Sequence, residues 1–294
     1  MICVVGSNGQ LALALKKEAP KFNLEIEFIP KEEVDILDFN TVNNFFTKKS
    51  PKVVINCSAF TDVDGAETNR IDAQLLNVLA AKNLAKSSKQ NHFLLIHIST
   101  DYVFNGKRKS IYTDSDEPDP LNWYGYTKMM GEKSINHHAE NSIIIRTSWL
   151  YSEFKKNFFV SIFQSQLPEL RVVNDQFGSP TYAGDLAIAI LSICENANKI
   201  EYFSQANITV HYSGNTTLSW YEFARLIKKT QKVQLNNYVE TSIIPINTNA
   251  LDQKALRPKF TPLQTSDFFL KLGIKPSNVE EGINSAIEAY EVSR

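Results

Sequence analysis

The chain has 294 residues, of which 43% are hydrophobic and 21% are charged, with 11 glycines and 11 prolines. This composition is that of an ordinary globular protein and argues against the disordered and fibrous classes. The formal net charge of -1, from 31 basic and 32 acidic residues, argues against a surface built for nucleic acid or for an anionic membrane.

The cysteines and histidines indicate neither a metal site nor a disulfide framework. Cys3, Cys57 and Cys194 are widely spaced without a Cys-x-x-Cys, and the five histidines form no metal-ligand spacing. No apolar run approaches the roughly 18 to 20 residues of a membrane span, and Met1 leads directly into a strand pattern. We therefore expect a soluble, cytoplasmic protein with no metal, no nucleic-acid partner and no membrane partner.

Apolar runs and helical patterns alternate along the first half of the chain. The predicted strands cover residues 1–5, 25–29, 53–57, 93–98 and 142–146. The predicted helices between them cover residues 13–18, 40–49, 73–88 and 124–133. Strands that alternate with helices predict an α/β fold with a doubly wound parallel sheet of Rossmann type.

The second half of the chain is less periodic and is punctuated by prolines at 180, 245, 258, 262 and 276. This pattern favours a smaller, loop-rich C-terminal α/β domain. An apolar helix near 185–196 is expected to pack back on the sheet. We therefore predict a Rossmann domain at 1–148 together with this returning helix, and a second domain that comprises mainly 149–294.

A glycine turn follows the first strand and opens the first helix. The pattern Gly6-x-x-Gly9-x-x-Ala12 in this context predicts a dinucleotide site, because glycines let the backbone approach a pyrophosphate that lies at a helix N-terminus. Ala12 departs from the usual glycine, and a simple tight turn is the alternative. The residues expected to contact the cofactor here are Gly6, Asn8, Gly9, Gln10 and Leu11.

The end of the second strand leaves the cofactor's identity open. Lys31 stands where an acidic residue would bind the adenosine ribose of NAD, and it could meet a 2′-phosphate instead, although Glu32 and Glu33 follow it. The prediction is NADPH or NADH, with a lean toward NADPH. Further candidate cofactor contacts, all otherwise ordinary loop or strand-end residues, are Asp35, Ile36, Ser58, Ala59, Phe60 and Ile98.

Tyr124 and Lys128 stand four residues apart in a segment with helical character, which places the phenol and the ammonium on one face. An ammonium close to Tyr124 would lower its pKa from about 10 and make it a usable general acid. Such a pair also arises by chance, and a tyrosine at a helix start often only packs. Ser99 and Thr100 end a buried strand, where open α/β sheets bind ligands, and this context favours the catalytic interpretation.

Several segments in one order resemble the extended short-chain dehydrogenase/reductases, and within them the dTDP-4-dehydrorhamnose reductases, over nearly the whole chain. They are Ser-Thr-Asp-Tyr-Val-Phe at 99–104, Tyr-Gly-x-Thr-Lys-x-x-Gly-Glu at 124–132, Arg-Thr-Ser-Trp at 146–149 and Asp-Gln-Phe-Gly-Ser-Pro-Thr at 175–181. The segments Trp-Tyr-Glu-Phe-Ala at 220–224 and Arg-Pro at 257–258 are also similar to that family's substrate domain.

The resemblance implies that NAD(P)H on the Rossmann domain reduces the C4 ketone of a nucleotide-linked 4-keto-6-deoxyhexose, with a dTDP-linked sugar for polysaccharide biosynthesis as the leading substrate. Tyr124 would protonate the C4 oxygen, Lys128 would bind the nicotinamide ribose and lower the pKa of Tyr124, and Thr100 would hydrogen-bond the ketone. Tyr124 and Lys128 are thus also expected to contact the cofactor. The implied substrate contacts are Thr100, Asp101, Tyr102, Trp149, Gln176 and Arg257.

Some of these roles have structural alternatives. Asp101 could cap the strand end rather than orient the sugar, and Trp149 could be a core residue. The turn that contains Gln176 could be merely rigid, and Arg257, the candidate for the diphosphate, could form a surface salt bridge. The resemblance implies a metal-bridged dimer in some relatives through an acidic residue of the first helix, but here Lys16 and Lys17 precede Glu18, so we expect a monomer or a homodimer of another kind.

Two other functions remain open on the sequence alone. A non-catalytic relative, such as the regulatory subunit of methionine adenosyltransferase, shares the Ser-Thr-Asp-Tyr-Val-Phe-like segment, although the intact Thr100, Tyr124 and Lys128 argue against it. A nucleotide-sugar epimerase or dehydratase is the third possibility, for which Asp101 leaves slight room.

Overall fold

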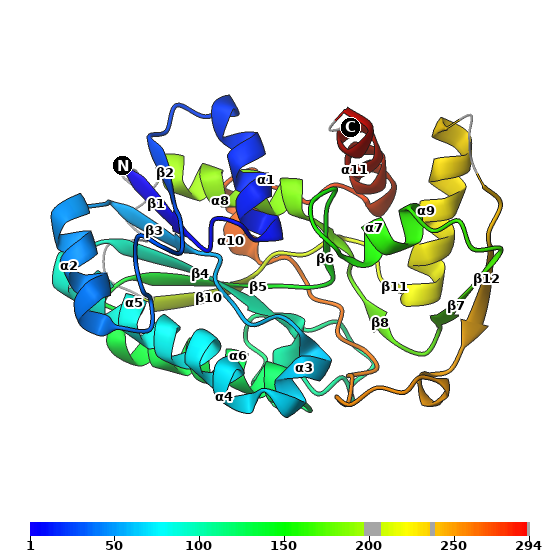
Figure 1. Ribbon diagram of the computed structural model, residues 1–294, viewed down its shortest axis with the longest axis horizontal. Coiled ribbons are helices and arrows are strands. Elements are labelled where there is room, and N and C mark those ends of the chain that lie inside the picture. Colours follow the sequence, from blue (N-terminus) through cyan, green and yellow to red (C-terminus); the bar gives the residue numbers. More distant parts are fainter. Residues whose placement is uncertain (197–206, 236–238, 293–294) are drawn as a thin grey trace.

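The computed structural model describes residues 1–196, 207–235 and 239–292. Figure 1 shows a central sheet between two layers of helices and, beside it, a smaller part that carries α7, α9, α11, β7 and β12. The chain passes more than once between these two parts. The boundary at 148/149 therefore stays a prediction.

Within the described ranges, the central sheet has six parallel strands in the order β10-β5-β4-β3-β1-β2. Their short apolar runs are those of strands covered on both faces. After β2 the chain returns past β1 to start β3, so the topological switch point lies between β1 and β3. The strands are β1 (Ile2–Val5), β2 (Ile26–Ile29), β3 (Val53–Asn56), β4 (Leu94–Thr100), β5 (Ser142–Thr147) and β10 (Asn207–His211).

Alternate strand residues point to the two helix layers. Val4 and Ile55 pack on one face with α1 (Gln10–Glu18), α8 (Ala183–Asn196) and α10 (Asp267–Lys271). Val5 and Val54 pack on the other face with α2 (Phe39–Lys49), α5 (Ala80–Asn91) and α6 (Trp123–His138). Both layers are visible above and below the sheet in Figure 1.

The crossover after β3 is built around one buried amide. It comprises α3 (Val63–Thr68), α4 (Arg70–Gln74) and the π-helical segment Leu75–Leu79, which continues into α5. Asn77, in the π-helical turn, accepts a hydrogen bond from Phe60 N at 2.9 Å and donates to Phe60 O at 3.1 Å and to Thr127 Oγ1 at 3.0 Å. These bonds fix the loop that follows β3 against α6.

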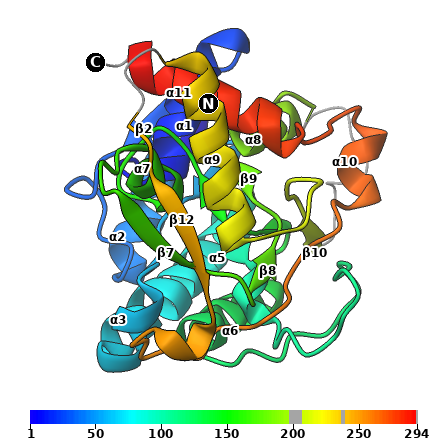
Figure 2. The same cartoon turned by 90° about the vertical axis from the view of Figure 1, so that its right-hand side faces the viewer.

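The smaller part has its own apolar core, in which Phe159, Phe223, Ile227 and Ile283 are fully buried. Figure 2 shows β7 and β12 side by side next to α9. Within the smaller part, β6 pairs with β9, β7 with β12 and β8 with β11. Its elements are β6 (Leu150–Tyr151), α7 (Phe158–Phe163), β7 (Glu169–Val173), β8 (Phe177–Gly178), β9 (Thr181–Tyr182), β11 (Leu218–Ser219), α9 (Trp220–Gln234), β12 (Ser242–Ile246) and α11 (Val279–Val292).

In the described portion of the chain, none of the helices has the length and apolar character that a membrane crossing requires.

Candidate active site

A cleft of about 600 Å³ lies at the carboxyl ends of the sheet strands, between the sheet and the smaller part. It includes the switch point between β1 and β3, where open α/β sheets bind ligands. The sequence-predicted residues that line it are Gly9, Gln10, Leu11, Ser58, Ala59, Ile98, Thr100, Asp101, Tyr102, Tyr124, Lys128 and Trp149.

The glycine turn after β1 depends on a residue that has no side chain. Gly6 has φ of +77°, and a Cβ there would lie 2.6 Å from the backbone nitrogen of Ser58. Only glycine fits at this close approach of two loops. Gly9 then caps α1, and its neighbours Gln10 and Leu11 line the cleft. Gly6 and Asn8 belong to the same turn but are not among the residues that line the cleft.

Three of the predicted cofactor contacts, Asp35, Ile36 and Phe60, lie elsewhere. Asp35 accepts a hydrogen bond from Leu37 N at 3.0 Å, and the Ile36 carbonyl accepts one from Asn83 at 3.1 Å. Neither residue lines the cleft, and neither does Phe60, whose backbone is held by Asn77. Their contact with a cofactor stays a prediction.

Tyr124 and Thr100 meet at the centre of the cleft. Thr100 ends β4, and Tyr124 lies in the first turn of α6, which Asn122 caps through Gly125 N at 2.8 Å. A hydrogen bond links the Thr100 hydroxyl and the Tyr124 phenol. Gly125 permits this arrangement, because a Cβ at that position would collide with the Tyr102 carbonyl.

The predicted lowering of the pKa of Tyr124 by Lys128 stays a prediction, and burial acts in the opposite direction in this structure. Burial raises the pKa of Tyr124 to about 12, and only the hydrogen bond with Thr100 acts in the lowering direction. Lys128 does lie on α6 four residues later, but its Nζ donates to Ile98 O at 2.6 Å and lies 3.2 Å from His97 Nε2. The amine is thus held against β4, and burial lowers its own pKa to about 8.

Asp101 is a buried hub at the strand ends. Its Oδ2 accepts hydrogen bonds from Thr261 Oγ1 at 2.6 Å and Ser148 Oγ at 3.1 Å, and its Oδ1 accepts one from Thr100 Oγ1 at 3.2 Å. Burial raises the pKa of Asp101 to about 6 despite these donors. Asp101 therefore lines the cleft and also orients the Thr100 hydroxyl at the strand end, while its contact with a sugar stays a prediction.

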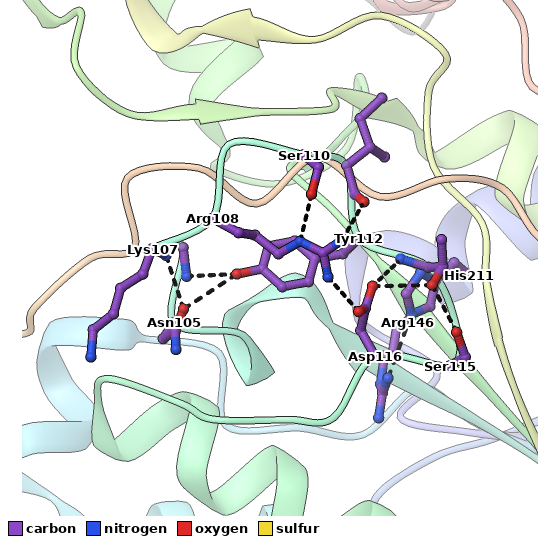
Figure 3. Close-up of polar contacts among 12 residues, drawn as sticks. Asn105, Lys107, Arg108, Ser110, Tyr112, Ser115, Asp116, Arg146 and His211 are labelled. Atoms are coloured by element: carbon purple, nitrogen blue, oxygen red, sulfur yellow. Dashed lines mark hydrogen bonds and ion pairs between the residues drawn. The ribbon is translucent and has the colours of Figure 1, made fainter.

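A buried ion pair supports the strand ends from behind. Arg146 of β5 donates to both carboxylate oxygens of Glu132 of α6, at 3.0 and 2.7 Å, and Ser99 donates to the same carboxylate. Figure 3 shows the loop after β4 over this region, with Arg108 paired to Asp116. These contacts hold the carboxyl ends of β4 and β5 in place beside Thr100.

Two stacked tryptophans form the opposite wall of the cleft. The Trp149 ring lies 3.5 Å from that of Trp220 with an interplanar angle of 3°, and Phe158 packs beside Trp220 at 4.5 Å. Trp149 has φ of +46°, a left-handed conformation that is rare for a large residue. Gly178 accommodates its indole, because a Cβ at 178 would collide with the ring. Trp149 is thus a cleft residue rather than a core residue.

Two predicted substrate contacts do not line the cleft. Gln176 is buried and donates to Thr248 Oγ1 at 3.1 Å. Arg257 forms a two-pronged ion pair with Asp64, at 3.1 and 2.7 Å, so the structure has the salt bridge that was the alternative to a diphosphate contact.

The sequence predictions missed part of the cleft. Lys155 and Lys156, both exposed, line it together with Asn157, which caps α7 through Val160 N at 3.1 Å. Trp220 was noted only as part of a family segment. The string Lys-Lys-Asn-Phe-Phe at 155–159, where two cations precede a helix cap, is the signal that could have identified this segment.

The site fits a dinucleotide. The glycine turn through Gly9, the loop at Ser58 and Ala59 and the pair of Tyr124 and Lys128 border one continuous cleft. In the ranges that the structure describes, no group of three or more histidine, cysteine, aspartate or glutamate side chains could hold a metal ion.

Comparison with known proteins gives a consistent result. The family model described as RmlD substrate binding domain matches residues 1–292. The chain is 34% identical over 289 residues to the spore coat polysaccharide biosynthesis protein SpsK of Bacillus subtilis, covering 98% of this chain and 96% of that protein. It is 31% identical to the dTDP-4-dehydrorhamnose reductase of Aggregatibacter actinomycetemcomitans, with 98% of each chain covered. It also matches the crystal structure of a dTDP-4-dehydrorhamnose reductase from Bacillus anthracis in complex with NADP, with a TM-score of 0.88, 31% identity and 98% of each chain covered.

Proposed function

The chain belongs to the family described as RmlD substrate binding domain, and from that premise we propose that it is an NAD(P)H-dependent oxidoreductase acting on a nucleotide sugar. The reaction is reduction of the C4 ketone of dTDP-4-dehydro-L-rhamnose to give dTDP-L-rhamnose for polysaccharide biosynthesis. The similar reductases, including the one solved with NADP, support the reaction and the cofactor. The proposal retains the cytoplasmic location that the sequence predicts.

The observation that carries the proposal is the convergence of Thr100, Tyr124 and Lys128 on the cleft that also contains the glycine turn. A bound nicotinamide cofactor would supply the hydride. Tyr124 would give its proton to the C4 oxygen as that oxygen gains charge, and the Thr100 hydroxyl would hold the same oxygen in place. Lys128 would bind the nicotinamide ribose from the floor of the cleft.

The raised pKa of Tyr124 suits a reduction. At about 12 it keeps the phenol protonated throughout the neutral range, so the proton donor is present at the start of each turnover. An alkoxide that forms at C4 is a stronger base than the phenolate and can still remove this proton. The environment of Tyr124 therefore favours donation of a proton to a reduced ketone.

The wall opposite the sheet would bind the nucleotide sugar. Lys155 and Lys156 supply positive charge for a diphosphate, a role that the sequence had assigned to Arg257. The stacked Trp149 and Trp220 offer a flat apolar surface for a sugar ring or a base. For the cofactor, Lys31 remains the candidate contact of a 2′-phosphate, which favours NADPH.

The test is nicotinamide oxidation by the purified protein, with NADPH and NADH separately, against dTDP-linked and UDP-linked 4-keto-6-deoxyhexoses. The C4 configuration of the product is read by NMR. Turnover with the dTDP-linked sugar is expected. Tight dinucleotide binding without turnover of any ketosugar would instead favour the non-catalytic alternative.

Tyr124→Phe should keep dinucleotide binding and lose roughly 10²- to 10⁴-fold in kcat, because it removes the proton donor and leaves the ring. Tyr126→Phe is the matched control, since Tyr126 lies on the same helix with its side chain exposed. Equal turnover in the two variants would refute the assigned role of Tyr124.

A further inference from the structure

A chain of hydrogen-bonding groups runs beneath the cleft from β3 through β4 to α6. Asn56 Oδ1 accepts from Ser58 N at 2.9 Å, and Asn56 Nδ2 lies 3.0 Å from His97 Nδ1. His97 Nε2 lies 3.2 Å from Lys128 Nζ, which donates to Ile98 O at 2.6 Å. Asn56, His97 and Lys128 are each 1% exposed, so each polar atom depends on these partners.

The backbone fixes the direction of this chain. The Ser58 N–H can only donate, so the atom of Asn56 that faces it is the oxygen and the atom that faces His97 is the amide nitrogen. An amide nitrogen can only donate, so His97 Nδ1 must present a lone pair. The proton of the neutral imidazole is then on Nε2 and points at Lys128.

An ammonium group has three donors and no lone pair, so it cannot accept this proton. If Lys128 carried a proton, two donors would face each other at one contact of the chain. With a neutral amine, each contact has one donor and one acceptor. We propose that Asn56 fixes the tautomer of His97 and that His97, as a positioning residue, holds Lys128 against β4 and favours its neutral amine form over the ammonium.

The surroundings of the pair support this assignment. Burial keeps the pKa of His97 well below its usual value, so the ring is neutral, and burial also lowers the pKa of Lys128. The titratable groups around Lys128 are Tyr124 and Glu132 on its own helix and Cys57 after β3. Glu132 and then Cys57 favour the charged amine, against the larger effect of burial, and the Glu132 carboxylate is also bound by Arg146.

The inference rests on the proposed function for its consequence. Lys128 would gain and lose its proton in the neutral to mildly basic pH range, and it lies on the same helix as the proton donor Tyr124. A neutral amine can also accept a hydrogen bond from a ribose hydroxyl, which an ammonium cannot. The charge on Lys128 would then be set by Asn56 and His97, which lie behind it in the core.

The first experiment measures the tautomer in the wild-type protein, without any sugar, by ¹⁵N NMR of the histidine rings. His97, identified by its loss in His97→Phe, is expected to carry its proton on Nε2 and to have an unprotonated Nδ1. The exposed His137 is the internal reference for a histidine ring at the surface. A proton on His97 Nδ1 in the wild type would overturn the proposal.

The second experiment reverses the tautomer with Asn56→Asp. An ionised carboxylate only accepts, so His97 would carry its proton on Nδ1 and present a lone pair to Lys128, which favours the ammonium. We expect roughly a tenfold gain in the proton affinity of Lys128. This gain is measured by NMR of ¹³Cε-labelled lysine, with Lys128→Met to assign the signal. The limb of the pH–rate profile that depends on Lys128 should move upward in pH by the same amount. A reversed tautomer with an unchanged Lys128 titration would overturn the proposal.

Both NMR measurements are independent of turnover. If the expected tautomer is found and no ketosugar is reduced, the proposed function fails while this inference stands. If the ketosugar is reduced and His97 carries its proton on Nδ1, the inference fails alone.

Discussion

Replacement of Asp101 by asparagine gives the sharpest test of how burial controls this site. The carboxylate accepts hydrogen bonds from three hydroxyl groups, those of Thr100, Ser148 and Thr261. An asparagine fills the same space, and a hydroxyl can rotate to accept from its amide nitrogen. The substitution therefore removes the titration of residue 101 while its contacts can be retained.

The magnitude follows from the pKa of Asp101, which burial raises from 3.8 to about 6. Each tenfold change in proton affinity is worth about 1.4 kcal/mol, so this change corresponds to about 3 kcal/mol. Between these two pH values the native state binds more protons than the unfolded state. The contribution of Asp101 to the free energy of unfolding therefore falls as the pH rises from about 4 to about 6.

The assay is urea unfolding of the wild type and Asp101→Asn at a series of pH values from 4 to 7. Other carboxyl groups titrate alike in both proteins, so the difference in unfolding free energy isolates residue 101. Relative to the wild type, the variant should gain up to about 3 kcal/mol across this range. A difference that does not depend on pH would refute the reasoning.

Asp64→Asn is the matched control with the opposite sign. The hydrogen bond from Arg257 holds the pKa of Asp64 below its usual value, so the wild-type carboxylate stabilises the fold increasingly as the pH rises through the acid range. This variant should lose stability relative to the wild type as the pH rises toward about 4, so its series is extended below pH 4. If the stability of both variants relative to the wild type changed in the same direction with pH, the measurement would not report the local environments of Asp101 and Asp64.

Three further substitutions test separate parts of the site. Gly178→Ala should displace the Trp149 indole and destabilise the fold by about 1–3 kcal/mol, with a change in tryptophan fluorescence. Glu132→Gln should cost about 3–5 kcal/mol in urea unfolding, because it leaves the buried charge of Arg146 without its counter-ion. Lys156→Ala should raise the KM for the nucleotide sugar and leave the Kd of the dinucleotide unchanged, as measured by kinetics and by titration.

Each of these has a control and a contrary outcome. Glu67→Gln breaks the more exposed pair with Arg70 and should cost less than about 1 kcal/mol, so equal costs at 67 and 132 would contradict the role of burial. Unchanged fluorescence in Gly178→Ala would show that the indole does not depend on that glycine. Lys48→Ala, on the exposed end of α2, should leave both constants unchanged. A weaker dinucleotide affinity in Lys156→Ala would place the lysine at the cofactor instead.

Local sequence patterns predicted most of the central sheet. The runs at 53–57 and 93–98 read as buried strands and became β3 and β4. The edge strand β10 was not predicted, although Ile208, Thr209 and Val210 are good strand residues. Its place is fixed by pairing with β5, more than 60 residues earlier, and no local period shows such a pairing.

The candidate site was predictable where a motif fixes local geometry and not where distant segments meet. Thr100 and Tyr124 were expected in one cleft and are found there. Arg257 was expected at the cleft but pairs with Asp64, which lies 193 residues away in sequence. The choice between a ligand and an internal counter-ion depends on that tertiary contact, and an arginine's own sequence context does not reveal it.

The pair of Tyr124 and Lys128 shows the same limit in electrostatic terms. Their four-residue spacing fixes a shared helix, but the pKa of each group depends on what surrounds its polar atom. Burial raises the pKa of the phenol and lowers that of the amine, so it shifts each group toward its neutral form, and the nearest partners of Lys128 come from β4 rather than from α6. A phenol that stays protonated is what a ketone reductase needs before hydride arrives. The shift that burial causes is opposite to the one that the motif suggested, and it agrees with the proposed donation of a proton by Tyr124.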